Sequence, residues 1–490
     1  MNAEITTEQE RAAIEAVPKG ILLGGRETEL DSTLKVEDPS TGSILTEISA
    51  AGPTEARAAM DIAVETQSSW AATTPRERGE ILRSAWELMI ERRDELALVM
   101  TLEMGKTLAE SATEVTYAAE FFRWYAEEAP RINGGYMRNP AAGGRLVVMR
   151  QPVGPCYLIT PWNFPLAMGT RKIGPAIAAG CTAIIKPPAL TPLSMLALGS
   201  LLKDAGLPDG VLSVLPTGSS SELSEPILTD ARLRKLSFTG STEVGIGLLK
   251  QAADSVLRTS MELGGNAPLI VFDDADLDLA VEGTMTAKMR NIGEACTAAN
   301  RLYVHADLAE EYAAKLAERM GALKVGRGTE SGVDVGPLIE KKARDGVAKM
   351  VDEAVEGGAE VLTGGGAVDG PGWFFEPTVL TNVDGSTRVV REEIFGPVAA
   401  IQTFTSEDEV VAMANDTQYG LVGYVFTETL HRAVRVAEAL EFGMVGVNSG
   451  LVSNPAAPFG GIKQSGLGRE GGFTGIDEYL EQKLVFIPDR

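Results

Sequence analysis

The stretch Val153-Gly154-Pro155-Cys156-Tyr157-Leu158-Ile159 reads as a buried β-strand, and it opens the region that decides the fold. From here to Phe272, apolar runs alternate with helix-like segments. Continuous apolar strands separated by helices of roughly 10–15 residues are typical of a parallel, doubly wound sheet, so the chain is predicted to be an α/β protein. The expected strands are 153–159, 181–185, 211–215 and 236–238, and the expected helices are 168–179, 194–205 and 241–253.

A second α/β series follows Glu262. Its expected elements are a strand over 267–272, a helix over 277–289 and a strand over 301–304. The N-terminal third is predicted to be mostly helical. The remaining expectations are helices over 76–93 and 111–127, surface loops over the Gly-rich residues 357–372, and strands outside both series over 136–151 and 479–487.

Composition argues against several classes of partner and site. The 44 Lys+Arg and 68 Asp+Glu give a net charge of −24, which disfavours nucleic acid and anionic membrane surfaces. Three cysteines without Cys-x-x-Cys or Cys/His spacing predict neither a disulfide framework nor a metal site, and they fit a reducing compartment. The polar segment Met1 to Val17 does not read as a signal peptide, and the apolar stretch Ile173 to Ile185 is too short to span a bilayer. A cytoplasmic protein is therefore expected.

Cys296 is the candidate nucleophile. It lies in a Gly-containing loop, and a second loop that starts at Glu262 precedes it by 34 residues. A thiol that can ionise and a carboxylate that can activate water suffice to make and hydrolyse a thioester. The two histidines, His305 and His431, lie in no motif-like setting, so the base is expected to be a carboxylate. Free cysteines are usually buried and behave as small apolar residues, so the surrounding motifs must decide whether Cys296 is catalytic.

Six short motifs follow one another along the chain. They are Pro161-Trp162-Asn163-Phe164-Pro165, Phe238-Thr239-Gly240-Ser241, Glu262-Leu263-Gly264-Gly265, the Cys296 loop, Glu393-Ile394-Phe395-Gly396-Pro397 and Pro458-Phe459-Gly460-Gly461. In this order and at this spacing they resemble the aldehyde dehydrogenase family, from about Asp38 to the C-terminus. Any one of them alone is a weak signal.

The resemblance implies a fold with two doubly wound sheet domains and a small β domain. A Rossmann-like cofactor-binding domain is expected over 1–133 and 152–262, and a catalytic domain over 263–457. Residues 134–151 and 458–490 are expected to form the oligomerisation or bridging domain of a homodimer or homotetramer. The implied partner is a small-molecule aldehyde, with no nucleic acid and no membrane.

The resemblance also assigns roles to residues. Cys296 attacks the aldehyde, Asn163 stabilises the oxyanion, and Glu262 activates the water that hydrolyses the thioester. Independently, the turn Thr239-Gly240-Ser241 joins a strand to a helix, whose first N–H groups can hold a pyrophosphate. The cofactor-binding residues implied are Thr160, Pro161, Trp162, Lys186, Ala189, Ser219, Ser220, Thr239, Gly240, Ser241, Leu263, Glu393 and Phe395.

The cofactor preference depends on Lys186 and Ala189. Family members commonly carry a glutamate at the position of Ala189, where it accepts hydrogen bonds from the adenosine ribose. A glutamate would repel a 2′-phosphate, whereas alanine does not and Lys186 would attract it. Ser219 and Ser220 offer further hydrogen-bond donors. NADP is therefore the expected cofactor, with NAD as the alternative.

Three residues resemble the positions that hold the distal carboxylate in family members acting on succinate semialdehyde: Arg171, Arg290 and Ser453. Two guanidinium groups and a hydroxyl suit a carboxylate, because arginine offers planar, bidentate donors. Oxidation of succinate semialdehyde to succinate is the expected activity. The alternatives are another ω-carboxylated aldehyde such as glutarate semialdehyde, a coenzyme A-acylating enzyme, which typically lacks the Glu262 base, and a catalytically idle protein on this scaffold.

Two positions depart from the pattern of many relatives. Ala298 replaces a second cysteine, so no redox switch beside Cys296 is predicted. Glu294 replaces a common glutamine, and its charge would either modulate the thiol pKa or interact with Arg290. The sequence leaves these two roles of Glu294 open.

Overall fold

The computed structural model describes residues 5–489, and within them the parallel sheet predicted around residues 153–272 is present. Five parallel strands form its centre: β7 (Cys156–Ile159), β8 (Ala183–Lys186), β9 (Leu212–Val214), β10 (Lys235–Thr239) and β11 (Arg258–Glu262). Three short antiparallel strands extend it: β1 (Ile21–Leu23), β2 (Arg26–Thr28) and β19 (Gly466–Leu467). The resulting order is β19-β11-β10-β7-β8-β9-β1-β2.

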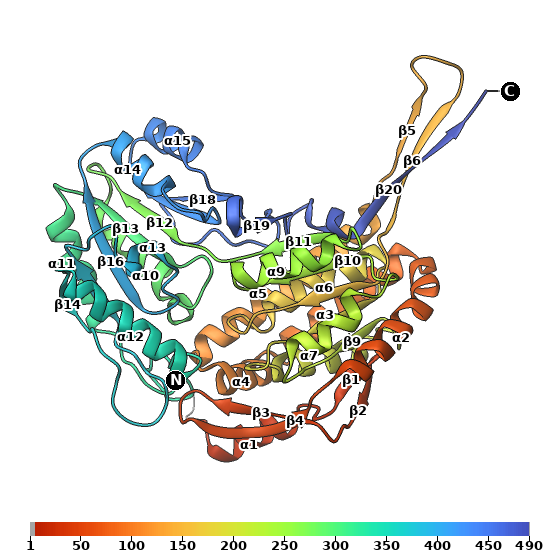
Figure 1. Ribbon diagram of the computed structural model, residues 1–490, viewed down its shortest axis with the longest axis horizontal. Helices are drawn as coiled ribbons and strands as arrows, with labels where there is room; N and C mark the ends of the chain where they lie inside the picture. The colour runs from red at the N-terminus through yellow and green to blue at the C-terminus, as the bar shows by residue number, and fades with distance from the viewer. Residues whose placement is uncertain (1–4, 490) are drawn as a thin grey trace.

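Helices cover this first sheet (Figure 1). Every residue of β7, β8 and β10 is buried, which is why their sequences read as continuous apolar runs. The helices between the strands are α6 (Ala167–Ala179), α7 (Leu193–Asp204), α8 (Ser220–Leu228) and α9 (Thr242–Ala253). Those before the first parallel strand are α1 (Thr7–Glu15), α2 (Pro53–Ala72), α3 (Pro75–Glu91), α4 (Arg93–Met104) and α5 (Leu108–Glu128). Helix α5 packs against both α3 and α6.

A second sheet of seven strands has the order β14-β15-β16-β13-β12-β17-β18. All its pairs are parallel except β14 with β15. Its strands are β12 (Ala267–Val271), β13 (Ala299–His305), β14 (Glu360–Thr363), β15 (Thr378–Thr381), β16 (Val398–Phe404), β17 (Val422–Phe426) and β18 (Met444–Val447). Its helices are α10 (Leu277–Met289), α11 (Ala309–Gly321), α12 (Lys341–Glu356), α13 (Arg388–Arg391), α14 (Glu407–Asn415) and α15 (Leu430–Ala439).

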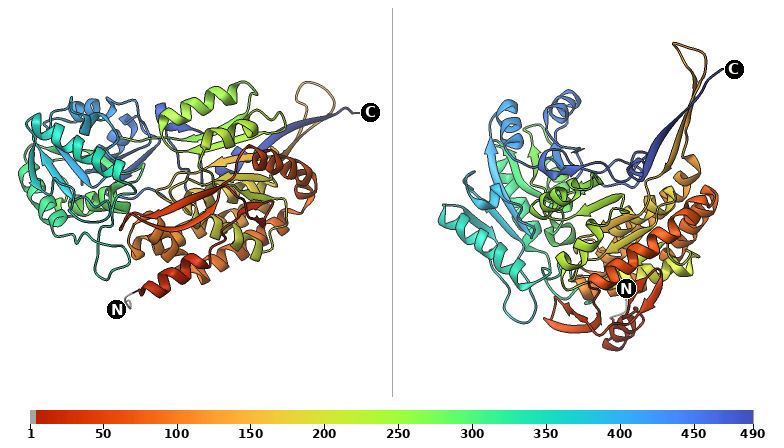
Figure 2. Two further views of the ribbon diagram at one scale, coloured as in Figure 1. Left: turned by 60° about the horizontal axis from the view of Figure 1, so that its bottom comes forward. Right: turned by 45° about the vertical axis from the view of Figure 1, so that its right-hand side comes forward.

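Two small antiparallel sheets complete the architecture. One pairs β3 (Thr33–Asp38) with β4 (Ser43–Ser49). The other has the order β20-β6-β5 and joins β5 (Gly135–Arg138), β6 (Arg145–Pro152) and β20 (Leu480–Ile487). The three-stranded sheet β20-β6-β5 is an arm that projects from the body, with the C-terminal end of β20 near its tip, as all three views show (Figures 1 and 2). No helix within residues 5–489 has the length and apolar character needed to cross a membrane.

Most predicted elements are confirmed, and two expectations are wrong. The helix predicted over 277–289 has those bounds, and 136–151 and 479–487 form strands of the arm. Residues 357–372 are not all loop, because Glu360–Thr363 forms the edge strand β14. The N-terminal third is mostly helical, as predicted, and it also contains β1 to β4, two of which are too short to show a two-residue period. Glu262, expected at the start of a loop, is instead the last residue of strand β11. The polar sequence of this strand does not indicate that its last three residues are buried.

Candidate active site

A cavity of about 230 Å³ lies between the two large sheets, and Cys296 is on its wall. The first sheet contributes residues at or just after the ends of β7, β10 and β11, and the second contributes the loops that carry Cys296 and Glu393. Among the residues singled out in the sequence, the cavity is lined by Pro161, Trp162, Asn163, Thr239, Gly240, Ser241, Leu263, Cys296, Glu393 and Phe395. Residues separated by more than 200 positions in the chain therefore meet in one place.

The loop before Cys296 is held in an unusual backbone conformation. Asn291, Ile292 and Gly293 have φ values of 55°, 62° and 79°. The left-handed region costs a non-glycine residue roughly 1–2 kcal/mol, so neighbouring contacts must maintain it. Glu110 of α5 accepts the N–H of Asn291 at 2.7 Å, and the Asn291 side chain donates to the Asn163 carbonyl at 3.1 Å and to the Glu294 carbonyl at 2.8 Å. Glu110 and Asn163, which belong to the part of the fold around the first sheet, thus hold the Cys296 loop in place.

The Asn163 side chain is oriented for oxyanion binding. One hydrogen of its amide group is donated to the Glu294 carbonyl at 2.9 Å, which leaves the second hydrogen free. The Cys296 backbone N–H has no acceptor among residues 5–489. A buried ion pair supports the loop, because Lys106 donates to the Asn163 carbonyl at 2.8 Å and pairs with Glu114 at 2.5 Å. Two fixed N–H donors beside a thiol are suited to a tetrahedral oxyanion.

Glu262 ends β11, directly before the cavity residue Leu263, and only 3% of its surface is exposed. Its Oε2 has no hydrogen-bond partner among the described residues. Burial raises the pKa of Glu262 well above its usual value, and the nearby charge of Glu470 raises it further. Gly460 makes room for the carboxylate, since a Cβ there would lie 2.7 Å from Glu262 Oε1. A buried carboxylate with a free oxygen and a raised pKa is suited to act as a general base.

The Cys296 thiol is half-buried and mostly protonated at neutral pH. Burial raises its pKa to about 12, with a further increase from the charge of Glu393, whereas Arg171 and Arg290 oppose the shift. A Cβ on Gly265 would lie 2.3 Å from the Cys296 carbonyl oxygen, so only glycine permits this approach of the two loops. The thiol is therefore held tightly but is not intrinsically activated in the ligand-free protein.

This raised pKa predicts the pH dependence of thiol reactivity. Because the thiolate is the reacting form, the rate of Cys296 alkylation by iodoacetamide without cofactor should rise about tenfold per pH unit between pH 7 and 10. Mass spectrometry of the Cys296 peptide measures that rate, and the peptides that contain the buried Cys156 and Cys181 serve as controls in the same digest. A plateau below pH 8 would show instead a thiol of low pKa.

The carboxyl ends of the first sheet fit a nucleotide cofactor. Thr160 follows β7, and Thr239 is the last residue of the neighbouring strand β10. The hydroxyl of each is buried with no hydrogen-bond partner among the described residues. Ser241 caps the N-terminus of α9, where helix N–H groups favour an anion. Lys186 is buried at the end of β8, where its ammonium donates to the Pro187 carbonyl at 3.3 Å and has no carboxylate within ion-pair distance among residues 5–489; burial lowers its pKa to about 8. Glu393 accepts the Gly265 N–H at 3.3 Å. Unused hydroxyls and an unpaired ammonium are the donors that ribose and phosphate oxygens require.

Some predicted residues lie away from the cavity beside Cys296. Ala189 is in the turn after Lys186, and Ser219 and Ser220 are at the start of α8; none of the three lines that cavity. The Glu294 carboxyl is fully buried and accepts the Ile339 N–H at 3.1 Å. It forms no ion pair with Arg290 within the described part of the chain, and burial raises its pKa well above the usual value. It therefore favours the neutral form.

A second cavity, of about 320 Å³, adjoins the first and shares Phe164 with it. Arg290 and Ser453 line it, as expected for a carboxylate subsite. The Arg290 guanidinium lies over the Phe164 ring at 4.9 Å and has no carboxylate within ion-pair distance among residues 5–489. Arg171 does not line this cavity. Only 1% of its side chain is exposed, and its Nε lies 3.6 Å from Glu470.

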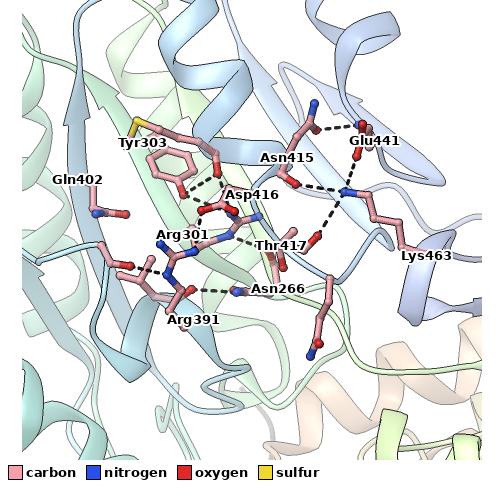
Figure 3. A pocket seen from close by; sticks show the side chains of 14 residues that line it. Asn266, Arg301, Tyr303, Arg391, Gln402, Asn415, Asp416, Thr417, Glu441 and Lys463 are labelled. Carbon is pink, nitrogen blue, oxygen red and sulfur yellow. Dashed lines mark hydrogen bonds and ion pairs between the residues drawn. The ribbon is translucent and has the colours of Figure 1, made fainter.

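A larger cavity, of about 700 Å³, lies elsewhere on the second sheet domain, and Figure 3 shows its side chains. Arg301, Arg391 and Lys463 contribute positive charge to it. Those charges are engaged within the protein: Arg391 pairs with Asp416 at 2.7 Å, Lys463 pairs with Glu441 at 2.6 Å, and Arg301 donates to three backbone carbonyls. The cavity lacks a candidate nucleophile. Its size therefore does not make it the catalytic site.

The sequence did not assign a role in the site to four residues that the structure places there. Lys106 and Glu114 hold the Asn163 loop, Glu110 holds Asn291, and Tyr117 lines the second cavity. Glu110, Glu114 and Tyr117 recur at a spacing of three or four residues, so they share one face of α5. Two carboxylates on an inward face were the available signal, but Leu166 and Asn291, whose N–H groups they accept, lie 52 and 181 positions away.

Comparisons with known proteins identify the family of this chain. A model described as "Aldehyde dehydrogenase family" matches residues 26–485. A succinate-semialdehyde dehydrogenase of Paenarthrobacter nicotinovorans is 54% identical over 91% of this chain and 99% of its own. A glutarate-semialdehyde dehydrogenase of Pseudomonas putida (50%) and the NADP(+) succinate-semialdehyde dehydrogenase GabD of Escherichia coli (49%) each match over 93% of this chain and 94% of theirs. The crystal structure of succinate-semialdehyde dehydrogenase from Burkholderia pseudomallei superimposes with a TM-score of 0.95 at 46% identity over all of both chains. The chain therefore belongs to the aldehyde dehydrogenase family.

Proposed function

We propose that this protein oxidises succinate semialdehyde to succinate with NADP. The observation that carries the proposal is Arg290, a guanidinium without a carboxylate partner among residues 5–489, which lines the cavity next to Cys296 together with Ser453. Such an arginine attracts an anionic group, and a hydroxyl beside it completes a carboxylate subsite. Relatives named for this substrate are 54% and 49% identical to the chain, which supports the same assignment.

The preference for NADP is supported by Lys186. An ammonium without a carboxylate partner at the end of β8 favours a phosphate, and Ala189 adds no competing charge. Thr160, Thr239 and Ser241 would hold other parts of the cofactor. The relative from Escherichia coli is named for NADP(+). When bound, the nicotinamide supplies the acceptor for the hydride that leaves the substrate.

The residues then divide the chemistry among themselves. The Cys296 thiol loses its proton to solvent and its sulfur attacks the aldehyde carbon. The oxygen that becomes negative accepts hydrogen bonds from the Asn163 amide and the Cys296 N–H. One such donor is typically worth about 3 kcal/mol of the barrier. Loss of hydride leaves a thioester on Cys296. Glu262 takes a proton from water, the water oxygen attacks the thioester carbon, and the sulfur leaves and takes up the proton held by Glu262, which regenerates the thiol.

Glutarate semialdehyde is a second candidate substrate. A relative that is 50% identical is named for this substrate. Glutarate semialdehyde is longer than succinate semialdehyde by one methylene group. Discrimination over one methylene in a pocket reaches only about 10–200-fold, so the enzyme should accept both acids at different rates.

We further propose a cytoplasmic homodimer or homotetramer that assembles through the arm. The exposed apolar residues of the arm, such as Tyr136 and Phe486, support the assembly, and the three free cysteines support the location.

A panel of aldehydes and cofactors tests the proposal. We expect kcat/KM for succinate semialdehyde to exceed that for butanal, its neutral four-carbon counterpart, by roughly 10²-fold, because Arg290 makes charge-assisted hydrogen bonds only to the acid. NADP should give faster turnover than NAD at equal concentration. Reduced-cofactor absorbance measures both comparisons.

Arg290→Gln is the matched variant for that panel. It keeps a polar side chain, although a shorter one, and removes the charge, so KM for succinate semialdehyde should rise while kcat changes little. Turnover of butanal by the wild-type protein as efficient as that of succinate semialdehyde would refute the carboxylate subsite. Faster turnover with NAD would refute the cofactor assignment alone.

A further inference from the structure

The side chain of Glu294, two residues before Cys296, is fully buried and only half satisfied. Its Oε1 accepts the Ile339 N–H at 3.1 Å, whereas its Oε2 has no hydrogen-bond partner among residues 5–489. An ionised carboxylate would leave a charged oxygen without a partner in a dry interior, which is far more costly than a neutral hydroxyl in the same place. The surroundings of Glu294 therefore fit a protonated carboxyl.

The backbone of Glu294 belongs to the site that binds the oxyanion. Its carbonyl accepts a hydrogen of the Asn163 amide at 2.9 Å and one of the Asn291 amide at 2.8 Å. The first of these bonds sets the direction in which Asn163 points its free hydrogen. A displacement of Glu294 would therefore turn the oxyanion donor away from the substrate.

Ile339 belongs to a segment that is pressed against the turn after α4. A Cβ on Gly336 would lie 2.1 Å from the Gly105 carbonyl oxygen, so only glycine permits this approach. Lys106, the next residue of that turn, donates to the Asn163 carbonyl at 2.8 Å. The hydrogen bond from Ile339 to the buried carboxyl therefore closes a ring of contacts around the oxyanion site.

Two charged groups act on the Glu294 carboxyl. Burial raises the pKa of Glu294 well above its usual value, the charge of Lys106 opposes the shift, and that of Glu340 adds to it. The ammonium of Lys106 is already paired with Glu114 at 2.5 Å, and Glu110, the other α5 carboxyl near the loop, accepts a backbone N–H at 2.7 Å. No cation is thus left to neutralise an ionised Glu294 within the described part of the chain.

We propose that Glu294 is a positioning residue that holds the Cys296 loop as a neutral carboxylic acid, and that loss of its proton at alkaline pH displaces the loop and slows oxidation. An ionised side chain has to move toward water, and the carbonyl that orients Asn163 moves with it. Glu294 then acts through the backbone, and not through the thiol pKa or through Arg290. This inference rests on the proposed roles of Cys296 and Asn163, but not on the identity of the aldehyde or the cofactor.

Glu294→Gln tests the proposal, because glutamine keeps the shape of the side chain and the acceptor for the Ile339 N–H but cannot ionise. Its kcat/KM for succinate semialdehyde should lie within about twofold of the wild-type value at pH 6–7 and exceed it by about fivefold or more at pH 10. The ionisation of Cys296 and Glu262 affects both proteins and cancels in the ratio. A ratio that stays constant from pH 6 to 10 overturns the proposal.

Glu340→Gln should move the alkaline decline of the wild-type activity to lower pH, because loss of the neighbouring negative charge lowers the pKa of Glu294. Glu340 makes no capping hydrogen bond with its side chain at the N-terminus of α12. Glu356→Gln is the matched control, since it removes the same charge from an exposed residue at the other end of α12. A decline that stays in place in Glu340→Gln, or moves as far in Glu356→Gln, would show that another group causes it.

Thermal unfolding tests the neutral acid without any assay of activity. The pKa of Glu294 is higher in the folded protein than in the unfolded chain, where it is about 4.3, so the wild-type protein loses stability as pH rises from there to the folded-state pKa. The thermal midpoint of Glu294→Gln should therefore exceed that of the wild-type protein by a margin that widens between about pH 5 and pH 8. A constant margin contradicts the proposal. If the wild-type protein oxidises no aldehyde at any pH, the proposed function fails, and the margin still tests Glu294.

Discussion

Cys296→Ser should lower kcat for aldehyde oxidation by about 10⁴-fold or more, the scale of loss seen when a covalent nucleophile is removed. Serine preserves the size of the side chain but presents a hydroxyl that is far harder to ionise. The described structure offers no histidine at the site that could activate it, since neither His305 nor His431 lines the cavity. Steady-state assays with the purified variant measure the loss, and its thermal midpoint should match that of the wild-type protein.

The other two cysteines provide the control for this prediction. Cys156 and Cys181 are buried in the first sheet domain, away from the cavity. A Cys156→Ala/Cys181→Ala variant should keep its kcat within a few fold, even if it is less stable because of the lost packing. Substantial activity in Cys296→Ser, or loss of activity in the double variant with its fold intact, would contradict the assignment of the nucleophile.

Glu262→Gln should separate the two halves of the reaction. Glutamine has the same shape but cannot take a proton from water, so thioester hydrolysis should slow by about 10²–10⁴-fold, the usual worth of a general base. Acylation of Cys296 consumes no water, so it does not require a base that activates water. We therefore expect a burst of about one equivalent of reduced cofactor per subunit, followed by very slow turnover. Stopped-flow absorbance records both phases.

Hydroxylamine supplies the control, because it cleaves thioesters without a general base. Its addition should restore turnover in Glu262→Gln by removing the acyl group from Cys296. Loss of the burst together with the steady state would assign Glu262 to acylation instead. An unchanged steady-state rate would mean that another group activates water. Because burial raises the pKa of Glu262, wild-type hydrolysis should accelerate with rising pH as this carboxyl ionises.

The parallel sheets could be predicted from sequence because their signals are local, and local motifs were also enough to select Asn163, Glu262 and Cys296 as candidate catalytic residues. Helix α10 has the predicted bounds, since a periodic apolar pattern runs its whole length. Strand β14 could not be predicted, because its residues are largely exposed at a sheet edge and carry no continuous apolar run. The surroundings of Arg171 were equally inaccessible. They depend on Tyr117, 54 positions before it, and on Glu470, 299 positions after it.

The central claim is that the Cys296 sulfur becomes acylated during turnover. The most direct test mixes Glu262→Gln with succinate semialdehyde and NADP, quenches the reaction in acid during the slow phase, and identifies modified peptides by mass spectrometry. The account predicts that the peptide containing Cys296 gains the mass of one succinyl group. A burst of reduced cofactor without that adduct, or an adduct on Cys156 or Cys181, would contradict it.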